Sequence, residues 1–399
     1  MKKIILSLLL LAFIIGCTNQ QEELSETTPE PETEAVNNST PPETNDLEEP
    51  KAQESQNTKK MEVYNPETGE NELVETDVVG SKTSSPGDEL LKMACENAIN
   101  DYPEWTAPTT DLIIWEDSDK MFNFRNSPED LSSRISSPVQ SSETLTDMDF
   151  VGLNEISYIK TTNNQWQIGL FKLNWPGASD NSIIYEKSES LSSIDVSPLT
   201  KDKFVIFEIK ENKVYLKYLE TTNSQEDVLL ETTASNGLSK LAVSPKATYA
   251  YLLYGNVLRI FDLSQKAKID DINSVSSVVW VGDSHLLYSN AEGTFIYGVK
   301  EKTKEKLGRI GSVSDLSFNP KNQGIIAYNT NSQGEVVSCQ TWNRLNSLEE
   351  GKIKTLTSER TAIIEKDEIL MYWRFKDNDW VLTPSHIEIT NYATVWKRY

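Results

Sequence analysis

The 399-residue sequence predicts an all-β fold built from repeated small sheets, preceded by a short helix and a disordered acidic segment. Two observations lead to this expectation. Short apolar strands recur at a nearly regular spacing beyond residue 145, whereas residues 18–60 contain almost no large apolar side chains. We therefore expect three parts, with boundaries at 1–16, 17–80 and 81–399, of which the last is long enough for one large folded domain.

The repeat is clearest in two stretches of the folded part. Val196-Ser197-Pro198 ends an alternating strand and is followed by two apolar strands within 203–219. Val243-Ser244-Pro245 is followed in the same way by two strands within 249–263. Proline fixes φ and cannot donate to a sheet ladder, so it suits the turn after a strand. Six copies align with separations of 46, 47, 37, 38 and 46 residues at Phe150, Val196, Val243, Trp280, Phe318 and Ile364.

Strand groups at a spacing of about 40–50 residues are typical of propeller blades. One four-stranded blade cannot bury both of its faces, so blades stack around an axis. The sequence thus predicts a β-propeller of six to seven four-stranded blades. Two further strands, Asp111–Trp115 and Lys120–Phe124, either close the ring with the C-terminal blade or begin a seventh. A pair of β-sandwiches, the competing fold, would not predict so regular a recurrence.

These Ser-Pro turns resemble those of the TolB-like and WD-like β-propeller families. The resemblance spans roughly residues 145–385 and rests chiefly on Val196-Ser197-Pro198 and Val243-Ser244-Pro245. The full Ser-Pro-Asp-Gly turn and the Trp-Asp dipeptide of these families are absent. The resemblance implies a propeller and leaves its subfamily open.

The N-terminus reads as an export signal. Met1-Lys2-Lys3 precedes the apolar run Ile4–Ile15, which is shorter than the roughly 20 residues that a membrane-spanning helix needs. Ile14-Ile15-Gly16-Cys17 resembles the lipobox of prokaryotic lipoproteins. The resemblance implies cleavage after residue 16, a diacylglyceryl group on Cys17, and an extracytoplasmic protein anchored to the cell membrane. The competing interpretation is an uncleaved signal anchor with an incidental cysteine.

Charge is unevenly distributed along the chain. Residues 18–80 hold 17 acidic residues and three lysines, a net −14, and the signal contributes +2, so the total of −23 leaves −11 for residues 81–399. The acidic, proline-containing segment cannot bury enough apolar surface to become ordered, which predicts a disordered and extended tether. The competing interpretation is an acidic interaction tail. No basic cluster occurs, so we expect no nucleic-acid partner.

Two cysteines remain after Cys17. Exported chains meet oxidising conditions, so Cys95 and Cys339 form a disulfide or remain two buried thiols. Cys95 lies in an expected short helix, Gly87–Ile99, with Leu91 and Ala98 on the same face. A bridge would fasten this helix to the folded body.

No motif for catalysis, a cofactor or a metal ion is found in the sequence. His285 and His386 are about 100 residues apart, and we expect both to be structural. The acid pairs Asp270-Asp271 and Glu349-Glu350 are typical of solvated loops. Most of the tryptophans are expected to pack between blades, although Trp175 in a loop could line a carbohydrate or peptide surface.

Two classes of function fit this organisation. The first is a non-catalytic binding or scaffolding module whose partner is an envelope protein or polymer, for which BamB-like and TolB-like propellers offer a fold analogy. The second is an extracellular propeller hydrolase acting on glycans, whose paired carboxylates could meet across the propeller. The missing nucleophile motifs favour the first.

Overall fold

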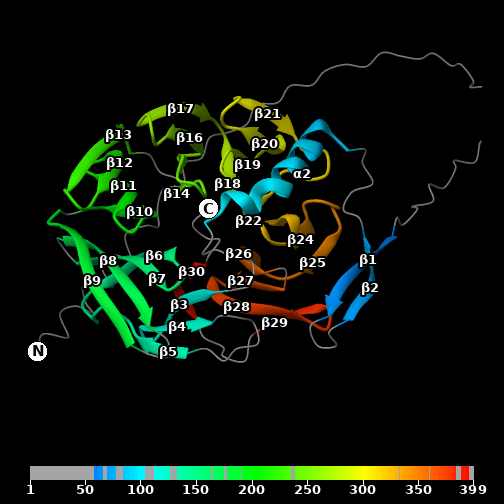
Figure 1. The fold of residues 1–399 in the computed structure, drawn as a ribbon, viewed down its shortest axis with the longest axis horizontal. Helices are drawn as coiled ribbons and strands as arrows, with labels where there is room; N and C mark the ends of the chain where they lie inside the picture. The colour runs from blue at the N-terminus through cyan, green and yellow to red at the C-terminus, as the bar shows by residue number, and fades with distance from the viewer. Residues whose placement is uncertain are drawn as a thin grey trace, which may run out of the picture. The chain divides into compact units, whose positions relative to one another are not determined.

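The computed structural model describes residues 58–65, 70–77, 84–103, 112–125, 133–162, 165–174, 178–189, 191–234, 239–331, 333–358, 360–382 and 388–394. Its sheets are arranged around a central axis (Figure 1). Five sheets have four strands, and a sixth, eight-stranded sheet consists of two four-stranded halves joined by one residue pair, Leu370 and Ile389. The described residues therefore form seven four-stranded blades.

The first five blades follow the chain in order, and each is a four-stranded antiparallel meander. Blade 1 contains β6 (Thr144–Gly152), β7 (Glu155–Thr162), β8 (Gln165–Asn174) and β9 (Ala178–Lys187). Blade 2 contains β10 (Ser193–Thr200), β11 (Lys203–Lys210), β12 (Lys213–Glu220) and β13 (Gln225–Thr233). Blade 3 contains β14 (Ser239–Val243), β15 (Tyr249–Tyr254), β16 (Val257–Asp262) and β17 (Ala267–Ile272).

Blades 4 to 6 repeat the plan. Blade 4 contains β18 (Val275–Val281), β19 (His285–Asn290), β20 (Gly293–Gly298) and β21 (Thr303–Lys306). Blade 5 contains β22 (Ser314–Asn319), β23 (Ile325–Asn329), β24 (Gly334–Ser338) and β25 (Arg344–Leu348), with a short 3₁₀ turn, η3 (Lys321–Gln323), after its first strand. Blade 6 contains β26 (Lys352–Ser358), β27 (Thr361–Lys366), β28 (Ile369–Lys376) and β29 (Asp379–Leu382).

Blade 7 is assembled from both ends of the folded part. Its first strand is the C-terminal β30 (Ile389–Thr394), which pairs antiparallel with β3 (Ile113–Asp117). The hairpin continues through β4 (Met121–Arg125) and β5 (Ser133–Ser136). The two strands expected within 111–125 thus share one sheet with the C-terminal strand, and this sheet is the seventh blade. Its formation closes the ring and removes an open sheet edge.

The sixth aligned position of the repeat needs correction. Ile364 lies in β27, the second strand of blade 6, whereas Trp280 and Phe318 lie in first strands. The first strand of blade 6 is β26, which contains lysines and threonines and therefore shows no continuous apolar run in the sequence. The separation of 46 residues before Ile364 therefore arises from comparing different strands.

The second strand of each blade is buried on both faces by the neighbouring blades, which explains the continuous apolar runs. Residues 204–208 of β11 and 250–254 of β15 are all buried. Several of the following hairpins use two-residue turns in which both φ values are positive, at Glu211-Asn212, Gly255-Asn256, Asp367-Glu368 and Asp377-Asn378. Such turns match the twist of antiparallel strands, so they keep the meander compact.

Serine side chains link the inner strands of neighbouring blades. The Oγ atom of Ser277 in β18 accepts a hydrogen bond of 2.8 Å from the backbone N–H of Leu316 in β22. The Oγ of Ser317 accepts from the N–H of Leu356 in β26 at 3.2 Å, and both pairs are 39 residues apart. Each serine thereby satisfies a buried donor of the next blade, which fixes the stacking of neighbouring inner strands.

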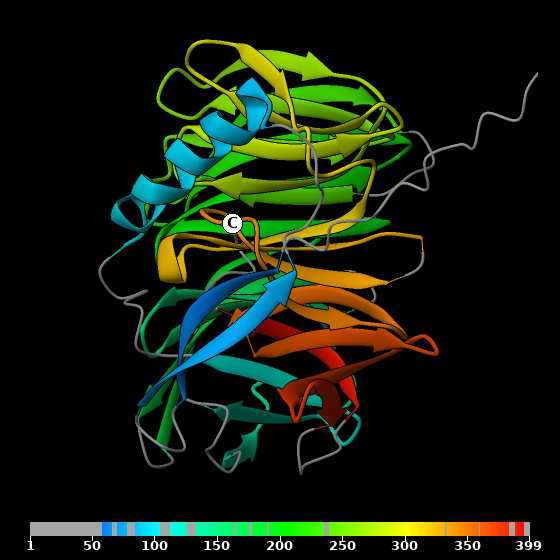
Figure 2. The same cartoon turned by 90° about the vertical axis from the view of Figure 1, so that its right-hand side faces the viewer.

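A single α-helix, α2 (Pro86–Ala98), precedes the blades in the described chain and lies on one face of the ring (Figure 2). Ser85 caps it: its side chain accepts a hydrogen bond from the N–H of Asp88, whose carboxylate accepts from the N–H of Ser85. Leu91, Cys95 and Ala98 are fully buried on its inner face. The expected short helix and its buried face are confirmed.

A hairpin occurs within the segment expected to be a linker. The strand β1 (Thr58–Asn65) pairs antiparallel with β2 (Glu70–Asp77). The expected tether of residues 17–80 thus contains two paired strands at its C-terminal end. Its remaining residues lie outside the described part of the chain.

Blades 1 and 2 are joined by a cluster that we call the blade 1–2 charge network. It comprises Tyr185, Lys187, Glu189, Glu208, Lys210, Lys217 and Glu226. Three lysines and three glutamates balance its charge. At its centre the ammonium group of Lys217 donates to the carboxylate of Glu208, which is 0% exposed, and lies 3.2 Å from a carboxylate oxygen of Glu226. The network therefore neutralises charges that the stacked blades remove from water.

We expect Glu226 to make stability depend on acid pH. Burial opposes its ionisation, but hydrogen bonds from Tyr185 and Lys187 and the charge of Lys217 hold its pKa below the ordinary value of 4.5. Because the folded pKa is the lower one, this contribution to the unfolding free energy is present above pH 4.5 and is lost as pH falls through the folded value. Thermal unfolding measured across this range should show a shallower acid slope for Glu226→Gln than for wild type. Equal slopes would contradict the assignment.

Candidate functional site: a cavity on the turn face of the ring

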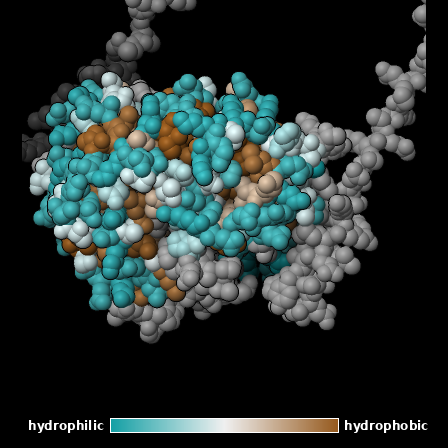
Figure 3. All heavy atoms as spheres, turned by 45° about the horizontal axis from the view of Figure 1, so that its top comes forward, coloured by the Kyte–Doolittle hydropathy of each residue, from teal (hydrophilic) through white to brown (hydrophobic). Residues whose placement is uncertain are grey.

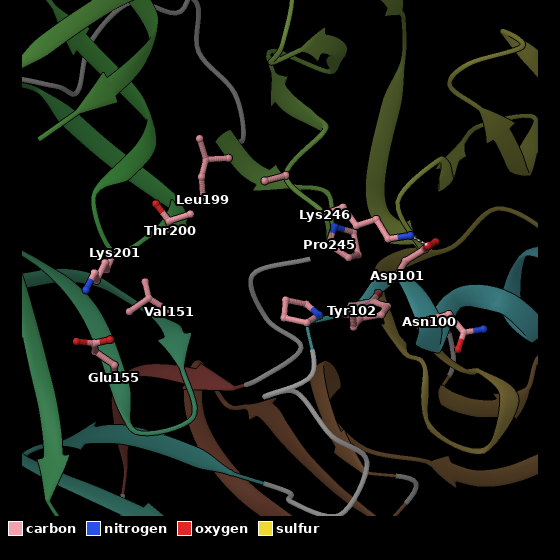
Figure 4. A pocket seen from close by; sticks show the side chains of 12 residues that line it. Asn100, Asp101, Tyr102, Val151, Glu155, Leu199, Thr200, Lys201, Pro245 and Lys246 are labelled. Atoms are coloured by element: carbon pink, nitrogen blue, oxygen red, sulfur yellow. Dashed lines mark hydrogen bonds and ion pairs between the residues drawn. The ribbon is translucent and has the colours of Figure 1, made fainter. Parts of the chain in front are cut away.

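A cavity of about 600 Å³ opens where the first-to-second-strand turns of blades 1, 2 and 3 meet the end of the N-terminal helix (Figure 4). The helix continues into η1 (Ile99–Asp101), and the chain then reaches Tyr102 and Pro103. Three blades and one helical segment thus build the walls. The lining residues are Asn100, Asp101, Tyr102, Pro103, Val151, Glu155, Leu199, Thr200, Lys201, Pro245, Lys246 and Ala247.

One wall of the cavity is held by a set of charged hydrogen bonds. The carboxylate of Asp101 accepts from the ammonium group of Lys246 and, at 2.9 Å, from the N–H of Asp283. The carboxylate of Asp283 accepts from the Oγ of Ser244 at 2.6 Å and from the N–H of Lys246 at 2.9 Å. The hydrogen bond to Asp101 raises the pKa of Lys246. Two backbone N–H groups and the buried Ser244 donate to these carboxylates, and the exposed ammonium group of Lys246 adds an ion pair, so the helical segment is held to blades 3 and 4 at this wall.

A disulfide fastens the helical part of that wall to blade 5. Cys95 in α2 is bonded to Cys339 in the turn after β24, with their Cα atoms 6.4 Å apart. Both residues are 0% exposed. Gly324 lies beneath the bridge with φ of 97°, where a Cβ atom would come within 2.8 Å of the Cβ of Cys95. The structure thus brings the two cysteines together as a bridge rather than as two separate thiols.

The opposite wall carries a lysine and a glutamate. Lys201 lies in the turn between β10 and β11, and Glu155 begins β7 (Figure 4). Within the described chain, neither side chain makes a hydrogen bond or an ion pair. Both lie at one edge of the cavity, beyond Val151, and their charged ends are turned toward the rim rather than toward Tyr102 and Pro103 (Figure 4). The rim on this side therefore carries one cation and one anion.

The other described residues singled out from the sequence do not line this cavity. Among the tryptophans, Trp166, Trp280, Trp342 and Trp380 are buried and Trp373 is partly buried. His285 is half-buried, and its Nδ1 lies 3.1 Å from the Oγ of Ser284. Burial lowers the pKa of the His285 imidazole. Glu349 and Glu350 are exposed and precede β26, as expected of loop charges. Asp270 and Asp271 instead lie in the strand β17, where the carboxylate of half-buried Asp270 accepts a hydrogen bond from the hydroxyl of Tyr297. Cys17, Trp175, His386 and Trp396 lie outside the described residues.

Sequence reasoning did not identify Lys201, Glu155 or Asp101 as site residues. Each is an ordinary charged residue of a turn or a strand end, and the sequence alone does not show that these turns converge. A usable signal was nevertheless present. Pro245 lies in the turn after β14, as expected, whereas Pro198 lies inside β10, three residues before Lys201 of the β10–β11 turn. Residues just after both prolines nevertheless gather on one face once the blades stack.

Within the described residues, no helix has both the length and the apolar character needed to cross a bilayer. The same part of the chain contains no group of three or more His, Cys, Asp or Glu side chains placed to hold a metal ion.

The ring of seven blades, closed by strands from both ends of the folded part, defines that part as a β-propeller. No family model and no curated protein matches the sequence. Similar solved structures include a chain of the Mitotic Checkpoint Complex, with 9% identity over 76% of this chain and 93% of that chain, and a TM-score of 0.48. Hsv2 of Kluyvelomyces marxianus is 16% identical over 60% and 79%, with a TM-score of 0.42. An uncharacterized protein of Listeria monocytogenes EGD-e is 8% identical over 64% and 87%, with a TM-score of 0.45. At these identities the similarity concerns the fold alone.

Proposed function

We propose that this protein is an extracytoplasmic lipoprotein whose propeller is a non-catalytic binding or scaffolding module for an envelope protein or polymer. The observation that supports the binding role best is the cavity on the turn face. It is built by turns from three blades, one wall is held by the ion pair of Lys246 with Asp101 and by a disulfide, and the other carries Lys201 and Glu155. A preformed cavity with a few oriented polar groups is the usual form of a binding site.

Rigidity favours binding because a preorganised site loses little conformational entropy when a partner docks. Asp101 is fixed at both carboxylate oxygens, and the helix that carries it is bonded to blade 5. The propeller itself supplies the other turns from stacked, buried strands. We infer that the partner meets a surface that is already in its binding shape.

The competing proposal, a glycan hydrolase, requires two carboxylates that work as an acid and a base or nucleophile. Asp101 and Glu155 are the two carboxylates that line the cavity. Asp101 is committed to Lys246 and to the N–H of Asp283, which suits a structural role rather than proton transfer. A panel of glycan substrates tests this directly. Turnover that disappears in Glu155→Gln would replace the binding module with an enzyme.

Site-specific cross-linking in cells tests the binding role. A photo-reactive amino acid replaces Asn100, an exposed residue of the cavity wall. The matched control replaces Lys213, an exposed residue. It begins β12, just after the β11–β12 turn, and so lies at the end of β11 that is far from the cavity. We expect a discrete adduct from position 100 that position 213 does not give. Identical adducts from both positions, or none from either, would overturn the proposal.

Membrane attachment makes a separate prediction. The resemblance at Cys17 implies two acyl chains on one residue, enough for stable anchoring because one chain binds only marginally. Replacing Cys17 by Ser should move the protein from the membrane fraction to the soluble fraction of the host. The measurement is fractionation followed by immunoblotting. Retention of Cys17→Ser in membranes to the wild-type extent would refute the lipid anchor.

A further inference from the structure

We infer that the cavity binds a short peptide segment of a partner protein, with an apolar anchor residue next to oppositely charged residues, and not an anionic polymer. This inference rests on the proposed binding function and narrows its partner from protein or polymer to protein. Three properties of the cavity carry it: its charge balance, its apolar lining and the position of its two unpaired charges.

The charge of the cavity is balanced, although the chain as a whole carries −23. The charged lining residues are Asp101, Glu155, Lys201 and Lys246, two acids and two bases. Lys246 is already neutralised by Asp101, which leaves Lys201 as the only unpaired cation among the described lining residues. Recognition of a polyanion needs concentrated lysine or arginine side chains. One lysine beside a glutamate on an acidic protein does not provide this.

Apolar side chains from four separate segments complete the lining. Val151, Leu199, Pro245 and Ala247 come from the three blade turns, and Tyr102 contributes an aromatic ring. A volume of about 600 Å³ lies within the usual range of roughly 300–1,000 Å³ for sites that enclose a small ligand. An apolar side chain that is buried in such a site, with polar groups around it, is the common anchor of protein recognition.

The two unpaired charges indicate what flanks the anchor. Lys201 and Glu155 come from adjacent blades and lie at the same edge of the cavity (Figure 4). A peptide with an acidic and a basic side chain beside its apolar residue would satisfy both of them. A neutral sugar would pair with neither charge, and a polyanion would be repelled by Glu155.

Apolar residues elsewhere on the surface do not form a comparable site. The exposed large apolar side chains lie on different elements, and the face shown in Figure 3 has its apolar atoms in separate patches within a hydrophilic surface. Single exposed apolar residues of this kind are normal and carry no partner. The members of this set are Met93, Leu153, Ile183, Val228, Ile369 and Val381. Of these, Leu153 lies in the β6–β7 turn, between two lining residues of the cavity.

The test selects ligands for the purified full chain from a phage-displayed library of random linear peptides, with heparin as the polyanionic probe. We expect the selected peptides to share an apolar residue next to an acidic one. Lys201→Glu should weaken their binding roughly tenfold, and exchanging the acidic residue of the peptide for lysine should restore binding to this variant. Lys213→Glu, the matched control at the start of β12, should bind like wild type. Thermal unfolding of each variant verifies that it folds.

Three results would overturn the inference. The first is that the selected peptides bind wild type and Lys201→Glu equally. The second is that heparin binds and that its binding depends on Lys201. The third is that no peptide is selected. If cross-linking from position 100 still captures a partner in any of these cases, the binding function stands and only its peptide chemistry fails. If peptides are selected but position 100 gives no adduct in cells, the peptide specificity stands and the cellular function fails.

Discussion

Replacing Lys217 by Met should lower the free energy of unfolding by about 3–5 kcal/mol, which is the effect expected when one partner of a buried ion pair is removed. Lys217 is 9% exposed and pairs with Glu208, which is 0% exposed, inside the blade 1–2 charge network. Burial disfavours the charged lysine, but its hydrogen bond to Glu208 and the nearby Glu226 raise its pKa above 10.5. The substitution leaves the carboxylate of Glu208 buried without its cation. Urea denaturation of the purified full chain, followed by tryptophan fluorescence, measures the loss.

Two further variants make this prediction specific. Lys213→Met changes the same residue type in the same strand, but the side chains of Lys213 and Glu231 are 54% and 49% exposed. An exposed ion pair contributes only about 0–1 kcal/mol, so this control should differ little from wild type. The double variant Lys217→Met with Glu208→Gln should recover part of the stability, because no charge is then stranded. Equal losses in Lys217→Met and Lys213→Met would show that the network does not stabilise the fold.

Removing the disulfide should cost about 2–5 kcal/mol of unfolding free energy. Cys95 and Cys339 are 244 residues apart, so the bridge restricts a long loop of the unfolded chain. In the folded chain it holds α2 against blade 5. Urea denaturation of Cys95→Ala with Cys339→Ala measures the loss, and amide hydrogen exchange should show faster exchange in α2 than in the blade strands.

The wild-type protein unfolded and refolded under reducing conditions is the matched control. It should have the stability of the double alanine variant, because both lack the bridge. Peptide mapping without reduction should recover Cys95 and Cys339 in one cross-linked fragment. Recovery of two free thiols from the oxidised protein would contradict the bridge, and unchanged exchange in α2 would show that the helix is held by packing alone.

The strands that the sequence predicted are those buried on both faces. β11 and β15 can be recognised in the sequence by their apolar runs, which arise because neighbouring blades cover these strands on both faces. The outer strands gave no such signal. β21 reads Thr-Lys-Glu-Lys with every residue exposed, and β17 is largely exposed, so their periodicity contains no apolar face. β30 was missed because a short strand with threonine, asparagine and tyrosine resembles a loop.

The cavity could be predicted less well than the fold, for a physical reason. Its lining residues come from four segments separated by tens of residues, and only the angle between stacked blades sets how closely their turns approach. The spacing of Pro198 and Pro245 predicted equivalent turns but could not show that Lys201 and Glu155 would lie at the same edge of the cavity. For the cysteines, the sequence limited the pairing to one possible bridge. Only the folded geometry, with Cα atoms 6.4 Å apart, brings them within bonding reach.

The composition of blade 7 has a consequence for how the protein is made. Its first strand, Ile389–Thr394, is synthesised after all the other strands, yet its partner β3 is among the first to emerge from the ribosome. Until the last strand arrives, β3 has an open edge, and the inner strand of blade 1 lacks a neighbour. Folding of the ring therefore cannot be completed during synthesis, and a chain that stalls before residue 389 exposes an unpaired strand that is prone to aggregation.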